Sequence, residues 1–400
     1  MPSLLATPRP PWWPRFSSTL RSTAVTARLG RALGIAIGIC FLTGMLSLYQ
    51  YSPWSWLPEP ASPVWGYRIT QGLHVATGTA TIPLIFVKLW SVYPNLFRWP
   101  PIRSVKNALE RGSVGILVSA TLVQLFTGFF NALNWYPFRW DFVAVHRYLA
   151  YVVVGSVLLH MAVKLPDIVY GLQTKVADGD VLTEIPWSEN PQAHSNAGDL
   201  PAPVTPGISR RGALTATGAG IGIVVLASVG QTLNPLQPIG LLAIRQPSKG
   251  PQKVPVNRTA DQAQVMAAAT AADWVLHVKG PKPYTLTLAE IESMALREAR
   301  LPINCVEGWS VGADWRGVRL LDIVERAGGT ADSRVHLQSL EKAWVFNNSF
   351  VEGPQVSHAL LATHLNGARL DVDHGYPLRL ISPNRAGVLN TKWLSTIEVL

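Results

Sequence analysis

Four runs of about 20 apolar residues limit what the N-terminal part of this chain can fold into. They span 31–50, 70–92, 112–132 and 142–164. Each run is long enough to cross the hydrocarbon core of a bilayer as an α-helix. Charged residues make up only 14% of the chain, against about a quarter in soluble domains. We therefore predict an all-α transmembrane bundle of four helices over residues 31–164.

The charges outside these runs predict which side of the membrane each end faces. Residues 1–30 are basic and contain no acidic residue, and the connector between the second and third runs is also basic. Lys and Arg concentrate in cytoplasmic loops, so we expect a cytoplasmic N-terminus; an organellar transit peptide is the alternative explanation. The net charge of +10 is scattered and accompanies no nucleic-acid motif, so we expect no nucleic-acid partner.

Three histidines lie inside the predicted membrane helices. His74 and His146 lie near the outer ends of the second and fourth runs, at matching depth. Ionisable side chains inside a membrane are costly and usually functional, and imidazole is a common axial ligand of haem iron. We predict that His74 and His146 bind one b-type haem; hydrogen bonding between helices is the alternative role.

The third histidine, His160, follows His146 by fourteen positions, which is about 21 Å along the same helix. Two histidines with this spacing resemble the pattern of di-haem cytochromes b. The second run departs from that pattern, because Lys88 stands fourteen residues after His74. His160 is therefore a candidate ligand of a second haem, with Lys88 as its candidate partner. A lysine that reaches toward the membrane surface is the alternative.

Two further segments separate the membrane helices from the C-terminal part. Residues 165–207 are polar and rich in Pro, Ser, Asn and Gly, which indicates a cytoplasmic linker. Residues 208–230 begin with Ser209, Arg210 and Arg211 and continue as a weakly apolar run of helical length. This pattern resembles a twin-arginine translocation signal, which implies the twin-arginine translocase as a partner during export of a folded domain. An ordinary fifth transmembrane helix is the alternative.

After a linker at 231–254, residues 255–400 have the composition of a soluble domain. Short strand-like runs such as WVLHVKG and YTLTLAEI alternate with turns and with helical stretches such as GVRLLDIVERAG, which predicts an α+β domain. Cys305 and Cys40 are the two cysteines of the chain, which excludes a disulfide framework and a Cys-rich metal cluster. A lone thiol such as Cys305 is either a buried core residue or a nucleophile, although no local histidine supports nucleophilic catalysis.

The segment LPINCVEGWSVGADW around Cys305 is similar to the molybdenum-binding segment of the sulfite oxidase superfamily, especially its bacterial methionine-sulfoxide-reductase branch. The resemblance implies a sulfite-oxidase-type molybdopterin-binding fold, with Cys305 as the catalytic thiolate ligand of molybdenum. A second segment, HGYPLRLISPNRAGVLNTKWL, resembles the part of this family that contacts the pterin and its phosphate. By the same resemblance, the residues that contact the cofactor are Asn257, Ser339, His374, Arg379, Asn390, Thr391 and Lys392.

These features predict a multi-pass molybdoenzyme of the bacterial cell membrane, with its catalytic domain on the outer face. The fused architecture resembles actinobacterial membrane-bound molybdopterin oxidoreductases. Mo-molybdopterin would exchange an oxygen atom with a small-molecule substrate, and haem b would link this centre to quinone or quinol. We expect reduction of a sulfoxide or a similar S- or N-oxide. Sulfite oxidation is the alternative, although no arginine cluster lies near Cys305 in the sequence. A non-catalytic haem membrane protein whose outer domain binds a partner is the alternative from another class.

Overall fold

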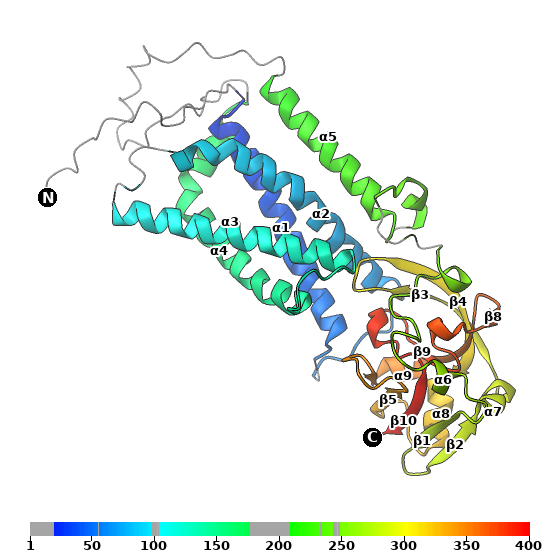
Figure 1. Ribbon diagram of the computed structural model, residues 1–400. Helices are drawn as coiled ribbons and strands as arrows, with labels where there is room; N and C mark the ends of the chain where they lie inside the picture. The colour runs from blue at the N-terminus through cyan, green and yellow to red at the C-terminus, as the bar shows by residue number, and fades with distance from the viewer. Residues whose placement is uncertain are drawn as a thin grey trace, which may run out of the picture. The chain divides into compact units, whose positions relative to one another are not determined.

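In the computed structural model, long α-helices form the N-terminal part of the chain and a sheet-containing domain forms the C-terminal part (Figure 1). The chain divides into two compact units. The first comprises Met1–Phe41 and Ala76–Val225, and the second comprises Leu42–Val75 and Leu226–Leu400. The structure describes residues 20–54, 56–97, 102, 104–176, 209–232, 234–242, 246 and 249–400.

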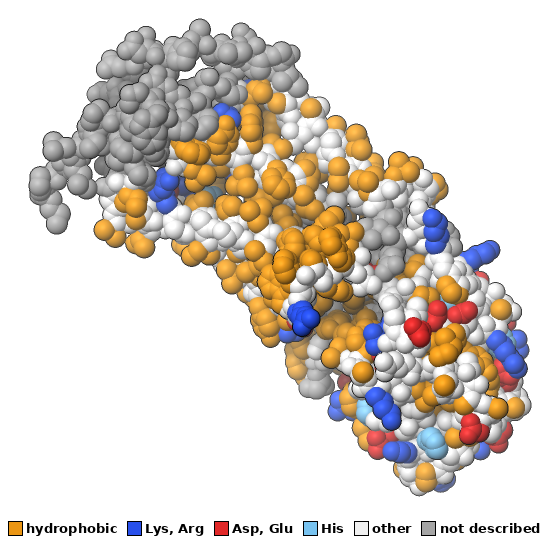
Figure 2. Space-filling model, viewed as in Figure 1, with side chains coloured by type: hydrophobic (Ala, Val, Ile, Leu, Met, Phe, Trp, Pro, Cys, Tyr) orange, Lys and Arg blue, Asp and Glu red, His pale blue; other side chains and the backbone are white. Residues whose placement is uncertain are grey.

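Within the described residues, five helices are long and apolar enough to cross a membrane. They are α1 (Thr23–Tyr51), α2 (Gly66–Val92), α3 (Val105–Ala132), α4 (Phe142–Gln173) and α5 (Arg210–Val229). Large apolar side chains remain exposed along them, for example Phe86 at 59% and Leu158 at 62%, and Figure 2 shows how densely such side chains cover the helical surface. A soluble protein rarely exposes so much contiguous apolar surface, so these helices indicate membrane association.

The helices extend beyond the apolar runs of the sequence. α1 begins at Thr23 and α3 at Val105, because a helix continues past its apolar part for as long as caps and backbone hydrogen bonds support it. Ser104, for example, caps α3 by accepting a hydrogen bond from the backbone N–H of Asn107. α4 continues to Gln173, so the predicted linker is wrong for residues 165–173. Residues 177–207 of that linker lie outside the described residues.

The C-terminal domain contains two sheets. One has the strand order β2-β1-β10-β5-β6, in which β1 and β10 are parallel and the other pairs are antiparallel. The other has the order β3-β4-β7-β8, with β9 paired to β7. The strands are β1 (Val275–Lys279), β2 (Tyr284–Thr287), β3 (Arg297–Asn304), β4 (Ser310–Arg319), β5 (Val335–Ser339), β6 (Asn348–Val351), β7 (Leu360–Leu365), β8 (Ala368–Arg369), β9 (Arg379–Ile381) and β10 (Leu394–Val399).

Short helices connect these strands. The run YTLTLAEI, which reads as a strand, is strand only to Thr287, because Thr287 and Glu290 form a capping box that starts a helix. The predicted linker at 231–254 also contains helical turns, η3 and η4. The short helices are η1 (Tyr93–Phe97), η3 (Asn234–Ile239), η4 (Pro251–Lys253), α6 (Met266–Ala269), α7 (Leu288–Ser293), α8 (Leu320–Arg326), α9 (Pro354–His358), η5 (Val372–His374) and η6 (Gly387–Leu389).

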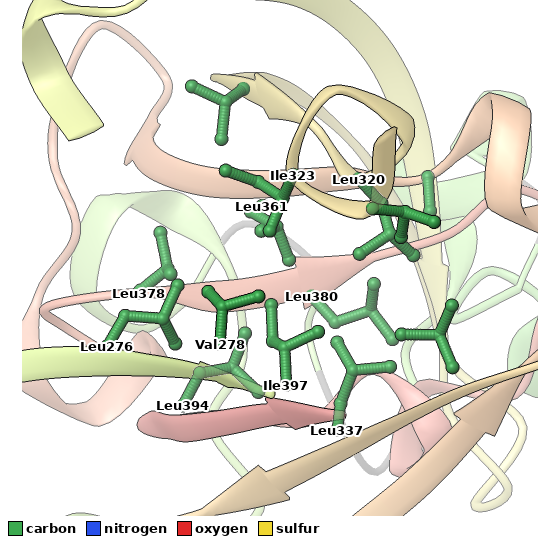
Figure 3. Packing of buried hydrophobic residues seen from close by; sticks show 14 of the residues in the cluster. Leu276, Val278, Leu320, Ile323, Leu337, Leu361, Leu378, Leu380, Leu394 and Ile397 are labelled. Carbon is green, nitrogen blue, oxygen red and sulfur yellow. The ribbon is translucent and has the colours of Figure 1, made fainter. Parts of the chain in front are cut away.

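Two apolar clusters hold the sheets in place. In the larger one, side chains from β1, β5, β9, β10 and α8 point toward one another (Figure 3), and residues such as Leu276, Ile323 and Ile397 are completely buried. Each such side chain contributes about 1.5–3 kcal/mol relative to exposure. The smaller cluster surrounds Trp315 on the second sheet and includes Cys305. The predicted metal ligand therefore lies at the margin of a packed core.

Candidate functional site

Cys305 follows β3 and opens a tight turn that leads into β4. Its backbone N–H donates to the Trp309 carbonyl (2.8 Å), and its carbonyl accepts from the N–H of Gly308 (3.0 Å). Gly308 has φ +94°, a left-handed conformation that favours glycine. The buried Sγ accepts hydrogen bonds from Asn257 Nδ2 at 2.6 Å and from the backbone N–H of Glu307 at 3.4 Å. Donors directed at sulfur favour the thiolate, which is the form that binds metals.

The second predicted segment supplies three basic side chains. Arg379 is the first residue of β9, His374 ends η5, and Lys392 precedes β10. Gly375 has φ +108°, and a Cβ atom there would lie 3.0 Å from Arg379 Cβ and 3.1 Å from Lys392 Cβ. Glycine at this position therefore permits the close approach of the two chain segments that carry the cationic groups.

All the residues that the resemblance assigns to molybdenum or the pterin line one cavity, and its empty space of about 660 Å³ includes solvent at its open side. A parallel β-bridge between Asn304 and Ala386 joins the two sequence segments. Lys392 Nζ donates to the carbonyl of Arg258 at 2.5 Å, across 134 positions of the sequence. The residues brought together around the cavity are Asn257, Cys305, Ser339, His374, Arg379, Asn390, Thr391 and Lys392.

Burial lowers the pKa of each basic group. Desolvation, reinforced by the nearby guanidinium of Arg379, lowers the pKa of Lys392 to about 7. Desolvation also lowers the pKa of Arg379 to about 9 and that of His374 to about 4. Arg379 and Lys392 donate their hydrogen bonds to backbone carbonyls rather than to carboxylates. Buried cations are costly without an anion, so the cluster suits a phosphate group.

Amide groups in the cavity also suit a polar ligand. Among the described residues, Asn390 Nδ2 and Asn257 Oδ1 are buried without a hydrogen-bond partner, and such atoms in a native protein usually meet a ligand or water. The part of the chain that the structure describes contains no cluster of three His, Cys, Asp or Glu side chains that could hold a metal ion. A metal at Cys305 would thus take its other ligands from a cofactor. The cavity therefore fits a pterin that brings sulfur ligands and a phosphate.

Sequence reasoning missed other parts of the cavity wall. Arg258 forms an ion pair with the buried Glu341 (Nη2–Oε1 2.5 Å), and its guanidinium lies 5.2 Å from the ring centroid of Trp344. Nothing in the local sequence pattern marks Glu341 or Trp344 as cavity residues. The sequence shows no arginine cluster near Cys305, yet the fold brings two arginines, Arg258 and Arg379, to the cavity that Cys305 lines.

In the second compact unit, His74 of α2 faces a Thr-Gly pair of α1. Its Nδ1 lies 3.4 Å from Thr43 Oγ1. A Cβ atom on Gly44 would lie 3.1 Å from His74 Cε1. The absence of a side chain at Gly44 thus lets the imidazole pack close against α1, and Thr43 orients its Nδ1 edge.

In the first compact unit, His146 of α4 faces a Thr-Gly pair of α3 in the same way. Its Nδ1 lies 3.1 Å from both Thr127 Oγ1 and the Gln124 carbonyl. A Cβ atom on Gly128 would lie 2.8 Å from His146 Cε1. Metal-ligating histidines commonly donate one ring N–H to such an oxygen and bind the metal through the other nitrogen. With the proton on Nδ1, Nε2 carries the lone pair of the ring.

His160 of α4 lies within electrostatic reach of Lys88, Lys164 and Glu110. Lys164 forms an ion pair with Glu110. Lys88 Nζ donates to the carbonyl of Thr26 at 2.7 Å. An ammonium group has no lone pair for iron, so this contact favours a structural role for Lys88 over the predicted role as a haem ligand.

A buried thiol and a basic, phosphate-suited wall in an α+β domain fit the class of metal–pterin oxidoreductases. Residues 262–400 match the family described as "Oxidoreductase molybdopterin binding domain". These residues thus form a molybdopterin-binding oxidoreductase domain of the sulfite oxidase superfamily, as predicted.

Three curated relatives illustrate the similarity. The uncharacterized oxidoreductase YuiH of Bacillus subtilis is 32% identical over 128 residues, which cover 31% of this chain and 64% of YuiH. Mitochondrial sulfite oxidase of Drosophila melanogaster is 31% identical over 156 residues, 32% of this chain and 27% of that protein. The protein-methionine-sulfoxide reductase catalytic subunit MsrP of Xanthomonas axonopodis pv. citri is 30% identical over 156 residues, 35% of this chain and 48% of MsrP. The chain thus spans less than two thirds of the length of each relative.

Proposed function

We propose that this chain is a membrane-bound molybdenum oxidoreductase that reduces a sulfoxide, or a similar S- or N-oxide, outside the bacterial cytoplasm. One observation carries the proposal: the cavity around Cys305 is lined by every residue that the sequence resemblance assigns to the cofactor. The overall reaction consumes two electrons and two protons and converts a sulfoxide to a sulfide and water.

Different residues of the cavity would bind different parts of the cofactor. The Cys305 thiolate would bind molybdenum, and Asn257 and the Glu307 N–H orient its sulfur. Arg379, Lys392 and the polar groups beside them would hold the pterin and its phosphate. When bound, the molybdenum–pterin group supplies two-electron oxygen-atom transfer.

The membrane helices would supply the electrons. His74 and His146 bind one haem b in this proposal. The Thr-Gly pair beside each histidine supports it, because the glycine lets the imidazole pack close to the neighbouring helix and the threonine orients Nδ1. His160 is a candidate for a second haem. A haem accepts electrons singly, so it can connect a quinol, which gives up two, to the molybdenum centre. The lipid bilayer and the quinone pool are thus partners of the protein.

The cavity wall favours a neutral organic substrate. Arg258 is already paired with Glu341, and Arg379 is assigned to the pterin phosphate in this proposal, so neither is left for an anionic substrate. Trp344 and Trp309 add apolar surface. Sulfite oxidation, with electrons flowing in the opposite direction, is the second candidate, because both arginines do line the cavity.

Metal and haem analysis of the purified protein tests this function. We expect molybdenum and b-type haem in the wild-type protein. Cys305→Ser should lower sulfoxide-dependent oxidation of a reduced viologen by at least about a hundredfold, because the metal loses its protein ligand, and should leave the haem absorbance unchanged. A wild-type protein without molybdenum, or a Cys305→Ser variant with wild-type turnover, would contradict the proposal. Sulfite-dependent reduction of ferricyanide without sulfoxide turnover would favour the second candidate.

A further inference from the structure

The turn that follows Cys305 is held by a residue of a membrane helix. Gln71 of α2 donates from Nε2 to the carbonyl of Val306 at 2.9 Å. Its Oε1 accepts a hydrogen bond from Ser47 Oγ at 2.9 Å. This second contact fixes the amide, so that the Nε2 side faces the turn. Gln71 is only 7% exposed, and water therefore does not easily replace the contact.

A second donor reaches the same turn from the segment that follows α5. Thr232 Oγ1 donates to the carbonyl of Gly308. Thr232 is itself tied to α2, because its carbonyl accepts from Arg68 Nε at 2.8 Å. The turn also lies directly against α2, since a Cβ atom on Gly308 would lie 2.5 Å from Val75 Cγ2. Two backbone carbonyls of the turn thus accept hydrogen bonds from side chains that lie outside residues 255–400.

These contacts bear on the position of the thiol. The sulfur of Cys305 accepts a hydrogen bond from Glu307 N–H, inside the same turn. A turn whose Val306 carbonyl lost its donor would leave a partly buried acceptor unsatisfied, which is costly. The turn would then relax toward other conformations and carry Glu307 N–H and Sγ with it.

We propose that Gln71 is a positioning residue for Cys305: through the Val306 carbonyl, helix α2 holds the thiol in the geometry that metal binding requires. The metal-binding role of Cys305 rests on the proposed function, whereas the positioning contact itself does not need the metal. Gln71 and His74 are three residues apart on α2 and therefore share a face. The same helix thus carries the proposed haem ligand and the support of the proposed molybdenum ligand.

The reactivity of Cys305 in the full-length protein without molybdopterin tests this inference. Cys40→Ser makes Cys305 the sole thiol, because the chain has two cysteines. The test variant is Gln71→Met, which keeps the length of the side chain and cannot donate. Gln50→Met is the matched control, because Gln50 is equally buried and donates instead to Asn384 Oδ1 at 3.2 Å. The measurement is the rate of Cys305 alkylation by iodoacetamide in detergent.

Cys305 is only 3% exposed, so access of the reagent limits alkylation, and a relaxed turn exposes the sulfur. We therefore expect Gln71→Met to accelerate alkylation about two- to tenfold, the factor that corresponds to one hydrogen bond; a slower rate than in Gln50→Met would count against the inference. Gln50→Met should leave the rate unchanged, with a similar melting temperature. Equal rates in the two variants, whether fast or slow, would overturn the inference. If Gln71→Met does not accumulate, Thr232→Val removes the other donor and should accelerate alkylation; an unchanged rate would count against the inference. Absence of molybdenum from the wild-type protein would refute the proposed function and leave this result intact.

Discussion

Lys392 and Arg379 place two cationic side chains in one buried wall of the cavity. Both donate hydrogen bonds to backbone carbonyls, which do not neutralise their charge. The pKa of Lys392, about 7 in the folded protein, lies below its ordinary value of about 10.4. In the cofactor-free protein, stability therefore falls as pH decreases from about 10 to about 7, because the unfolded chain binds the proton more tightly. An anion in the cavity would offset this loss.

Sulfate should accordingly stabilise the cofactor-free protein, and more strongly at about pH 6 than at about pH 8.5. Below about pH 7 Lys392 carries its proton in the folded state and attracts the anion; above this pH the amine is neutral. At ten times the dissociation constant, sulfate contributes about 1.4 kcal/mol, which raises the melting temperature by about 2–4 °C. Thermal unfolding followed by tryptophan fluorescence measures this effect.

The control is Lys392→Met, which removes the titrating amine from the site. In this variant the sulfate effect should be small at both pH values. If sulfate stabilises Lys392→Met with the same pH dependence as the wild-type protein, the anion binds elsewhere.

Sequence motifs predict only some of the residues that form the cavity and its support. Cys305 and Arg379 lie in segments whose residue pattern resembles a known family, so they could be predicted. Gln71 and Glu341 could not, because each acts through contacts with residues distant in the sequence. Their importance depends on the fold rather than on a local pattern.

Helices and strands differ in how well the sequence predicts them. β1, β5 and β10 alternate apolar and polar residues and were predictable. β3 and β4 were not, because they contain charged residues, Pro302 and Gly317. Gly317 is required by packing, since a Cβ atom there would lie 2.0 Å from the carbonyl oxygen of Leu361 on β7. The apolar runs predict where the long helices lie, but their ends depend on caps and packing.

Gly128 lies where α3 packs against His146 of α4, and its substitution tests the proposed haem site. Gly128→Leu should abolish haem binding, because even its Cβ would lie 2.8 Å from His146 Cε1, so the larger side chain would displace the imidazole. Gly115→Leu on the same helix is the matched control, since a Cβ there meets nothing within 4 Å. The pyridine haemochrome assay measures haem per protein. Equal haem content in the two variants would place the haem elsewhere.

At the scale of the whole molecule, the compact units do not follow the order of the sequence. The sequence predicts a boundary between a membrane domain and residues 255–400, yet Leu42–Val75 belongs to the same unit as the C-terminal domain. Arg385 Nε lies 3.1 Å from Glu59 Oε2, with both side chains buried, and burial raises the pKa of Glu59. Breaking a buried ion pair costs about 3–5 kcal/mol. Periodicity and composition do not predict such long-range contacts.

This unit cannot form unless the C-terminal domain reaches the side of the membrane where the α1–α2 connection lies. We therefore predict that replacing Arg210 and Arg211 by lysines strands the domain in the cytoplasm while the first four helices still insert. The twin-arginine pathway recognises guanidinium groups, and lysine does not substitute for arginine in such recognition. Protease added to right-side-out vesicles should digest the wild-type domain and leave that of the variant protected. Unchanged digestion in the variant would mean that α5 is an ordinary membrane anchor. In the protected variant the contact between Gln71 and Val306 cannot form, so Cys305 should also be alkylated faster once the membrane is opened with detergent.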